Sequence, residues 1–211
     1  LNKVLYMRKQ NIGIIIKVLI IIGVLSFFLY SNYADEQDRI NFNKTLKTAS
    51  DLENVTDKNY VAIYDKGSMS VDEVIAFEKN DIENLTREID LLNKFKNQTR
   101  NSTYKDYLEI EVNRLTYEKR ALESYLESYN LYKEYLNGDM SSSAYFSRQK
   151  DIDSQINRTG NQIDVEKTNA INYLEKHPHL NKTLTDLELD EDFSTIEWGG
   201  TGNKNSRLYV Y

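Results

Sequence analysis

The two histidines of the chain, His177 and His179, stand two positions apart and precede an acidic run over residues 186–192. A His-x-His pair beside carboxylates is a pattern that can bind a metal ion. The pair has no fixed third ligand, and the acidic run lacks the central glycine and the spaced terminal glutamate of a calcium loop. We therefore expect no metal site, and we interpret residues 186–192 as a solvated acidic segment.

A glycine-rich stretch over residues 199–204, with the sequence GGTGNK, is the second candidate for chemistry. It lacks the G-x-x-x-x-G-K-[ST] spacing of a phosphate-binding loop, and no helix is predicted to follow it. The chain has no cysteine, which excludes thiol catalysis, and it contains no serine-hydrolase or zinc-protease motif. Carboxylates are frequent on the predicted helices, where such residues usually form the solvent face. We expect neither an enzymatic activity nor a cofactor.

Sixteen tyrosines are the most unusual feature of the composition. Several gather near the end of one predicted helix and just beyond the turn that follows it. Tyrosine offers a large contact area with a polar tip, so this cluster predicts either a surface for a protein or glycan partner or the core of a helical bundle. The core is the more common of the two. A binding site, if present, is expected at Tyr125, Tyr129, Tyr132, Tyr135, Tyr145 and Phe146.

The elements that must position these side chains are helices. Between residues 24 and 198 the chain contains only three glycines and one proline. A chain so poor in helix breakers, and so rich in Leu, Glu, Lys and Tyr, is predicted to be mainly helical.

A capping box formed by Ser70 and Glu73 starts a first bundle helix, predicted over residues 71–97. The polar stretch 97–103 either ends this helix or bends one longer helix, and Thr103 is the expected N-cap of a separate second helix. Heptad spacing predicts the buried stripe of the first helix. Its expected members are Ile75, Ile82, Leu85, Ile89 and Leu92.

The second helix is predicted over residues 104–136, with Asn137 and Gly138 at its end. The third is expected to start after Ser141 and to end before Pro178. The second helix carries two adjacent packing stripes, which suits the middle helix of an antiparallel three-helix bundle. A hairpin that forms a homodimer is the alternative.

Other segments are less periodic. Apolar residues over 35–55 have helical spacing, which predicts either a stalk or a short helix packed on the bundle. Residues 60–64, with the sequence YVAIY, favour a strand. Residues 193–198 and 207–211 predict a small β-hairpin, with a disordered tail as the alternative.

One long apolar run covers residues 12–30 and has basic residues before it and acidic residues after it. As a helix it spans about 28 Å, close to the ~30 Å hydrocarbon core of a bilayer. The positive side should stay in the cytoplasm, which places the rest of the chain outside. Lys17 interrupts the run, but its long stem can reach the membrane surface. The alternatives are a signal peptide cleaved near Ala34, where Asn32 fits the cleavage pattern poorly, and a buried helix.

The sequence thus predicts a mainly α fold: an N-terminal transmembrane helix, then an antiparallel, coiled-coil-like three-helix bundle, with a small C-terminal β-hairpin. The expected segments are a short cytoplasmic segment (1–11), a transmembrane signal-anchor helix (12–30), a juxtamembrane stalk and linker (31–70), the helical bundle (71–177) and an acidic tail (178–211).

The expected function is that of a single-pass bacterial envelope protein whose extracytoplasmic bundle binds another protein. It would serve as a scaffold or accessory part of a secretion, conjugation or cell-wall machine. An immunity or exclusion protein that blocks a toxin or phage component at the membrane is the alternative. The net charge of −6 argues against nucleic acid as a partner, because phosphate contacts need clustered Lys and Arg.

Overall fold

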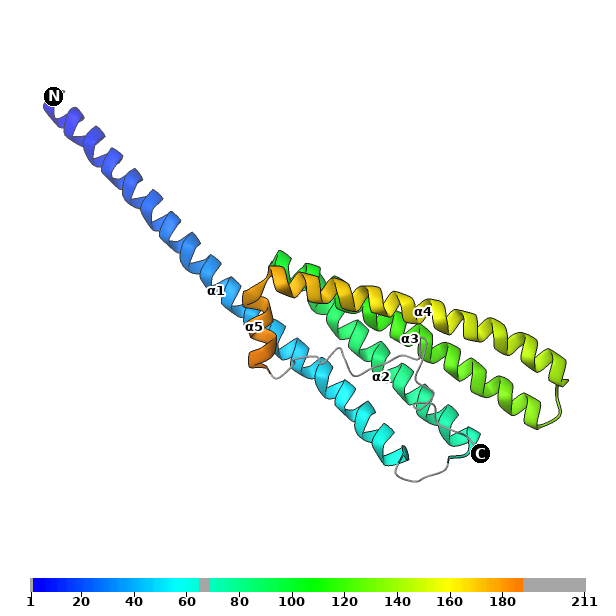
Figure 1. The fold of residues 1–211 in the computed structure, drawn as a ribbon. Helices are drawn as coiled ribbons and strands as arrows, with labels where there is room; N and C mark the ends of the chain where they lie inside the picture. Colours follow the sequence, from blue (N-terminus) through cyan, green and yellow to red (C-terminus); the bar gives the residue numbers. More distant parts are fainter. Residues whose placement is uncertain (1, 65–68, 188–211) are drawn as a thin grey trace. The chain divides into compact units, whose positions relative to one another are not determined.

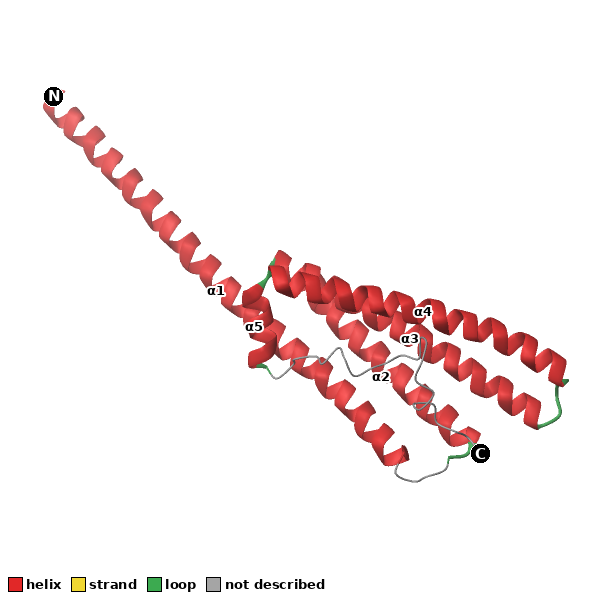
Figure 2. Cartoon of the chain, in the orientation of Figure 1, coloured by secondary structure: helices red, strands yellow, loops and turns green. Residues whose placement is uncertain are grey.

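The computed structural model describes the backbone of residues 2–64 and 69–187, and the side chains of residues 19–52 and 69–187. Within these ranges the chain forms helices and no strand (Figure 2). The prediction of a mainly helical chain with a helical bundle is confirmed. The helices, labelled in Figure 1, are α1 (Asn2–Tyr64), α2 (Val71–Gln98), α3 (Ser102–Leu136), α4 (Ser142–Lys176) and α5 (Pro178–Asp186).

The chain divides into two compact units, residues 1–41 and residues 42–211. In the first unit the large apolar side chains from Leu19 to Tyr30 are between 48% and 70% exposed. In the part of the chain that the structure describes, none of the helices combines the length and the apolar character needed to cross a membrane. Residues 12–18 of the expected transmembrane helix have no described side chains, and that helix, which gains no support here, stays a prediction.

The start of α2 is set by the capping box predicted from the sequence. The Ser70 amide donates to Glu73 Oε2 at 2.9 Å, and the Glu73 amide donates to Ser70 Oγ at 3.3 Å. Two amides that have no partner inside the helix are satisfied in this way. Local sequence alone therefore defines where α2 begins.

The polar stretch after α2 separates two helices and does not bend a single one. Asn101 Oδ1 accepts hydrogen bonds from the amides of Thr103, at 2.9 Å, and Tyr104, at 3.2 Å. The N-cap of α3 is therefore Asn101, and the prediction of Thr103 was wrong. Asn is a stronger N-cap than Thr because its longer side chain reaches two amides here.

The turn between α3 and α4 follows the sequence prediction. Gly138 takes a positive φ of 79°, a conformation that glycine adopts without strain. Ser141 caps α4 by accepting a hydrogen bond from the Ala144 amide at 3.3 Å. The turn brings the last residues of α3 back against the first residues of α4.

Figure 1 shows α2, α3 and α4 side by side, and α3 packs closely on both of its neighbours, whereas α2 and α4 do not pack closely on each other. Ion pairs from Lys96 to Glu109 and from Lys133 to Asp72 join α2 to α3 near their two ends. The middle position predicted for the second helix explains why it carries two packing stripes.

Part of α1 belongs to the core of the second unit. Phe42 is fully buried, and its ring stacks on that of Tyr104 with centroids 4.1 Å apart. Leu46 and Ala49, one and two turns later, lie in the same cluster as Leu92 and Leu108. Of the two alternatives for residues 35–55, packing on the bundle therefore holds over Phe42, Leu46 and Ala49.

Helix α1 continues to Tyr64, so the strand predicted over residues 60–64 was wrong. The β-branched and aromatic residues of this segment disfavour a helix by at most about 0.7 kcal/mol each. A helix that is already formed extends at little cost, since each added residue gains one backbone hydrogen bond. Local preference is therefore overruled here.

Replacing Phe42 with Ala is expected to lower the free energy of unfolding by about 3–5 kcal/mol, because it empties a fully buried aromatic site. Urea denaturation of the full chain, followed by circular dichroism, measures this change. The matched control is Phe146→Ala, because Phe146 is 65% exposed. Equal effects of the two substitutions would contradict the core position of Phe42.

The short helix α5 was not predicted. Pro178 stands at its first position, where proline needs no hydrogen-bond partner, so the residue that ends α4 also starts α5. Leu180 and Leu184, one turn apart, are its buried residues. The predicted hairpin strands, 193–198 and 207–211, lie outside the described residues.

Candidate functional site

Four aromatic residues gather where α3 ends and α4 begins. The rings of Tyr135 and Tyr145 are stacked with centroids 4.8 Å apart, and Tyr145 also contacts Tyr132 at 6.2 Å and Phe146 at 5.3 Å. We call Tyr132, Tyr135, Tyr145 and Phe146 the aromatic tip. Its rings come from both helices, so the turn at Gly138 is what brings them together.

The aromatic tip is partly open to solvent. Phe146 is 65% exposed and Leu136, at the end of α3, is 57% exposed, while Tyr145 is half-buried. Burial raises the pKa of the Tyr145 phenol, and the nearby Tyr132, Asp153 and Tyr135 raise it further. Tyr145 therefore keeps its proton and offers an apolar ring with a hydroxyl tip, the kind of surface that proteins use to bind other proteins.

Tyr125 and Tyr129, the other two residues of the predicted site, lie further back along α3 and are half-buried. The structure thus brings together four of the six predicted residues. The helical spacing on α3 correctly predicted that Tyr132 and Tyr135 lie near each other. The predicted turn correctly placed Tyr145 and Phe146 of α4 beside them. Whether this cluster binds a partner is not tested by its geometry and stays a prediction.

A second group of functional interest is charged and buried. Arg114 Nε donates to Glu111 Oε2 at 2.9 Å, and Arg114 Nη1 donates to Glu118 Oε1 at 2.8 Å. The three side chains are 4–6% exposed. The attraction between a buried guanidinium and two carboxylates offsets part of the large free-energy cost of removing each charge from water. We call Glu111, Arg114 and Glu118 the buried ion triad.

Helix α2 buries polar residues along the stripe that faces inward. Val74 and Leu92 belong to this stripe and have apolar side chains. Between Ile75, which is also buried, and Leu92 the buried positions are taken by Glu78, Asp81, Asn84 and Glu88. The predicted stripe was therefore only partly right, since Ile82, Leu85 and Ile89 are half-buried while Ile75 and Leu92 are buried.

Glu78 is the most strongly perturbed of these acids. Burial raises the pKa of its carboxyl group from 4.5 to about 8, and the charge of Asp81, one turn further along α2, adds to this rise. The Glu78 Oε2 atom is buried and accepts no hydrogen bond. The carboxyl group is therefore protonated at neutral pH. The general expectation that helix carboxylates face solvent was wrong at this position.

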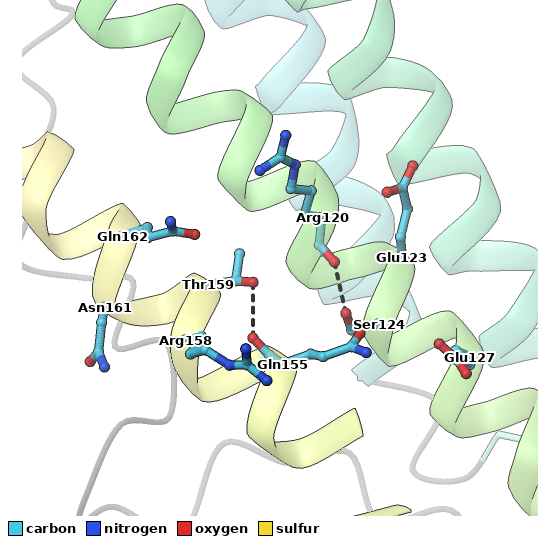
Figure 3. A pocket seen from close by; sticks show the side chains of 9 residues that line it. All are labelled: Arg120, Glu123, Ser124, Glu127, Gln155, Arg158, Thr159, Asn161 and Gln162. Atoms are coloured by element: carbon cyan, nitrogen blue, oxygen red, sulfur yellow. Dashed lines mark hydrogen bonds between the residues drawn. The ribbon is translucent and has the colours of Figure 1, made fainter. Parts of the chain in front are cut away.

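An open groove of about 680 Å³ runs between α3 and α4 (Figure 3). Its floor holds Ser124 and Thr159, two small residues whose hydroxyls donate back to carbonyls of their own helices at 3.0 and 2.9 Å. Its sides carry both signs of charge and several amides. The side residues are Arg120, Glu123 and Glu127 of α3 and Gln155, Arg158, Asn161 and Gln162 of α4.

The histidines are not brought to a metal-binding cluster. His177 Nδ1 lies 2.8 Å from the Tyr173 carbonyl oxygen, and its ring stacks on the Tyr173 ring at 4.1 Å. Among the residues that the structure describes, no group of three or more His, Cys, Asp or Glu side chains could hold a metal ion. The acidic run beyond residue 187 and the stretch 199–204 lie outside the described residues.

Comparison of the chain with protein-family models, with curated proteins and with solved structures finds no match. Any functional conclusion must therefore come from the residues themselves.

Proposed function

We propose that this chain is a membrane-tethered module that binds another protein through the aromatic tip. The observation that carries the proposal is the exposure of Phe146, at 65%, on a base of stacked tyrosines. An exposed aromatic residue held by its neighbours loses little side-chain entropy when a partner covers it. The bundle then acts as a rigid holder for a small contact surface.

The tether is supported by the exposed apolar residues of α1. The described residues 19–30 rise about 18 Å as a helix, which is less than the ~30 Å of a bilayer core. The sequence continues the apolar run back to Ile12, which adds about 10 Å. An apolar surface of this extent needs a covering, and lipid is the covering that fits a run flanked by Lys and Arg on one side.

Contact at the aromatic tip is tested with a photo-crosslinking amino acid placed at position 146 of the full chain in intact host cells. A discrete cross-linked product is expected there, and it should disappear when Tyr145 is changed to Ser. The matched control is the same amino acid at position 165, because Val165 is an apolar residue of α4 that is 57% exposed. The same product from both positions, or none from position 146, would refute the proposed contact.

The tether has its own readout in those cells. Protease added to intact cells is expected to remove the bundle and to leave the apolar segment in the membrane fraction. A bundle that survives in intact cells but is cut in permeabilised cells would reverse the proposed topology. The protease result and the cross-link at position 146 are independent, so a reversed topology would not by itself refute the contact at the aromatic tip.

A further inference from the structure

The groove between α3 and α4 carries charges that are not paired within the described residues. Arg120 lies over the Tyr117 ring at 5.5 Å, and Arg158 Nε donates to the Ser154 carbonyl at 3.4 Å, but neither forms an ion pair there. Glu127 likewise has no ion pair in the described part of the chain. Unpaired charges of both signs along one groove favour a partner that brings both signs in return.

The spacing of these charges is self-complementary. Arg120 and Glu127 are seven residues apart, so they lie on one face of α3, about 10 Å from each other along the helix. When two copies of α3 meet face to face in antiparallel order about a two-fold axis between residues 123 and 124, Arg120 of each copy lies opposite Glu127 of the other. A two-fold contact repeats each pair, which doubles its effect.

Small residues on the floor of the groove support the same contact. The small floor residues Ser124 and Thr159 allow the helices of the second copy to approach closely (Figure 3).

We propose that two copies of this chain pair through the α3–α4 groove, with Arg120 of each copy bound to Glu127 of the other. The groove is distinct from the aromatic tip, and the dimer would present two such tips to the partner. This arrangement does not depend on the proposed function.

The decisive test is a charge swap in the full chain purified in detergent, with the dimer dissociation constant measured by sedimentation over a dilution series. Arg120→Glu and Glu127→Arg are each expected to weaken the dimer about tenfold, because each sets two like charges together twice. The combined swap R120E/E127R should restore the constant to near the original value, since opposite charges again face each other.

If the copies associate through the apolar segment of α1, all these variants will have the same dimer dissociation constant. If the chain is monomeric at every concentration, no dimer exists for the combined swap to restore. Either result, or a swap that stays as weak as its single variants, overturns the proposal. Because the chain has no cysteine, a single Glu123→Cys variant adds an independent check. It should form a disulfide between copies on mild oxidation, whereas Glu175→Cys, on an exposed position of α4 outside the groove, should not.

Discussion

Replacing Arg114 with Met is expected to lower the free energy of unfolding by about 3–5 kcal/mol. The buried ion triad would lose its cation, which leaves Glu111 and Glu118 buried at 4–6% exposure without the charge that compensates them. The cost comes from the two stranded carboxylates and not from lost packing, because Met has a volume and an apolar stem similar to those of Arg. Urea denaturation of the full chain at pH 7 measures the change.

Two further variants separate this cause from a general loss of a charge. Arg87→Met removes an arginine from the exposed pair with Glu83, whose side chains are 65% and 68% exposed, and should cost less than about 1 kcal/mol. The triple variant E111Q/R114M/E118Q should recover part of the lost stability, since amides cost less to bury than unpaired carboxylates. A triple variant less stable than R114M alone would show that the triad is not the source of the effect.

Raising the pH from 4.5 to 8 is expected to destabilise the fold through Glu78. The pKa of its carboxyl group is about 8 in the folded chain, against 4.5 in the unfolded chain. Within this window the folded state holds a proton that the unfolded state has released, so a rise in pH favours unfolding. Each pH unit costs about 1.4 kcal/mol, up to about 5 kcal/mol over the window.

The variant Glu78→Gln isolates this contribution from all other titrating groups. Its free energy of unfolding should match that of the original chain near pH 4.5 and exceed it increasingly toward pH 8, because folding of the original chain must take up a proton that its unfolded state has released. The exposed Glu83→Gln, on the same helix, is the control and should follow the original chain at every pH. Parallel stability curves for E78Q and the original chain would show that Glu78 is not buried in solution.

The parts of the fold that the sequence could predict are those set by neighbours along the chain. The Ser70–Glu73 capping box, the Ser141 cap and the helix end at Asn137 and Gly138 each depend on a few adjacent residues, and all three were correct. The long helices themselves were correct for the same reason. Asn101 in place of Thr103 shows the limit, because two good caps stood close together and only the geometry of the turn chose between them.

The buried acids could not be recognised by their residue type. Carboxylates on an amphipathic helix usually face water, and this general expectation does not hold for Glu78, Asp81 and Glu88, which are buried. Their spacing held a usable signal, since they continue the 3- and 4-residue steps that run from Val74 to Leu92. At these positions the spacing along the helix indicates burial correctly, whereas the residue type does not.

The aromatic tip was predictable because its rings lie within 15 residues of one another in the sequence. A turn at Gly138 suffices to bring Tyr135 and Tyr145 together, whatever the rest of the bundle does. The groove between α3 and α4 was not predicted, because it depends on small residues that stand on two different helices, Ser124 on α3 and Thr159 on α4.

The ion pairs that join the two ends of α2 and α3 contribute little energy, yet they decide how far one helix may slide along the other. Apolar residues repeat every heptad, so a slide of seven residues would still bury many of them. Lys96 meets Glu109 and Lys133 meets Asp72 at one alignment only. A slide of α2 by seven residues that brings Thr116 opposite Lys96 also sets Lys133 opposite Lys79, and the like charges repel. These surface ion pairs therefore disfavour an alignment in which many of the apolar residues would still be buried.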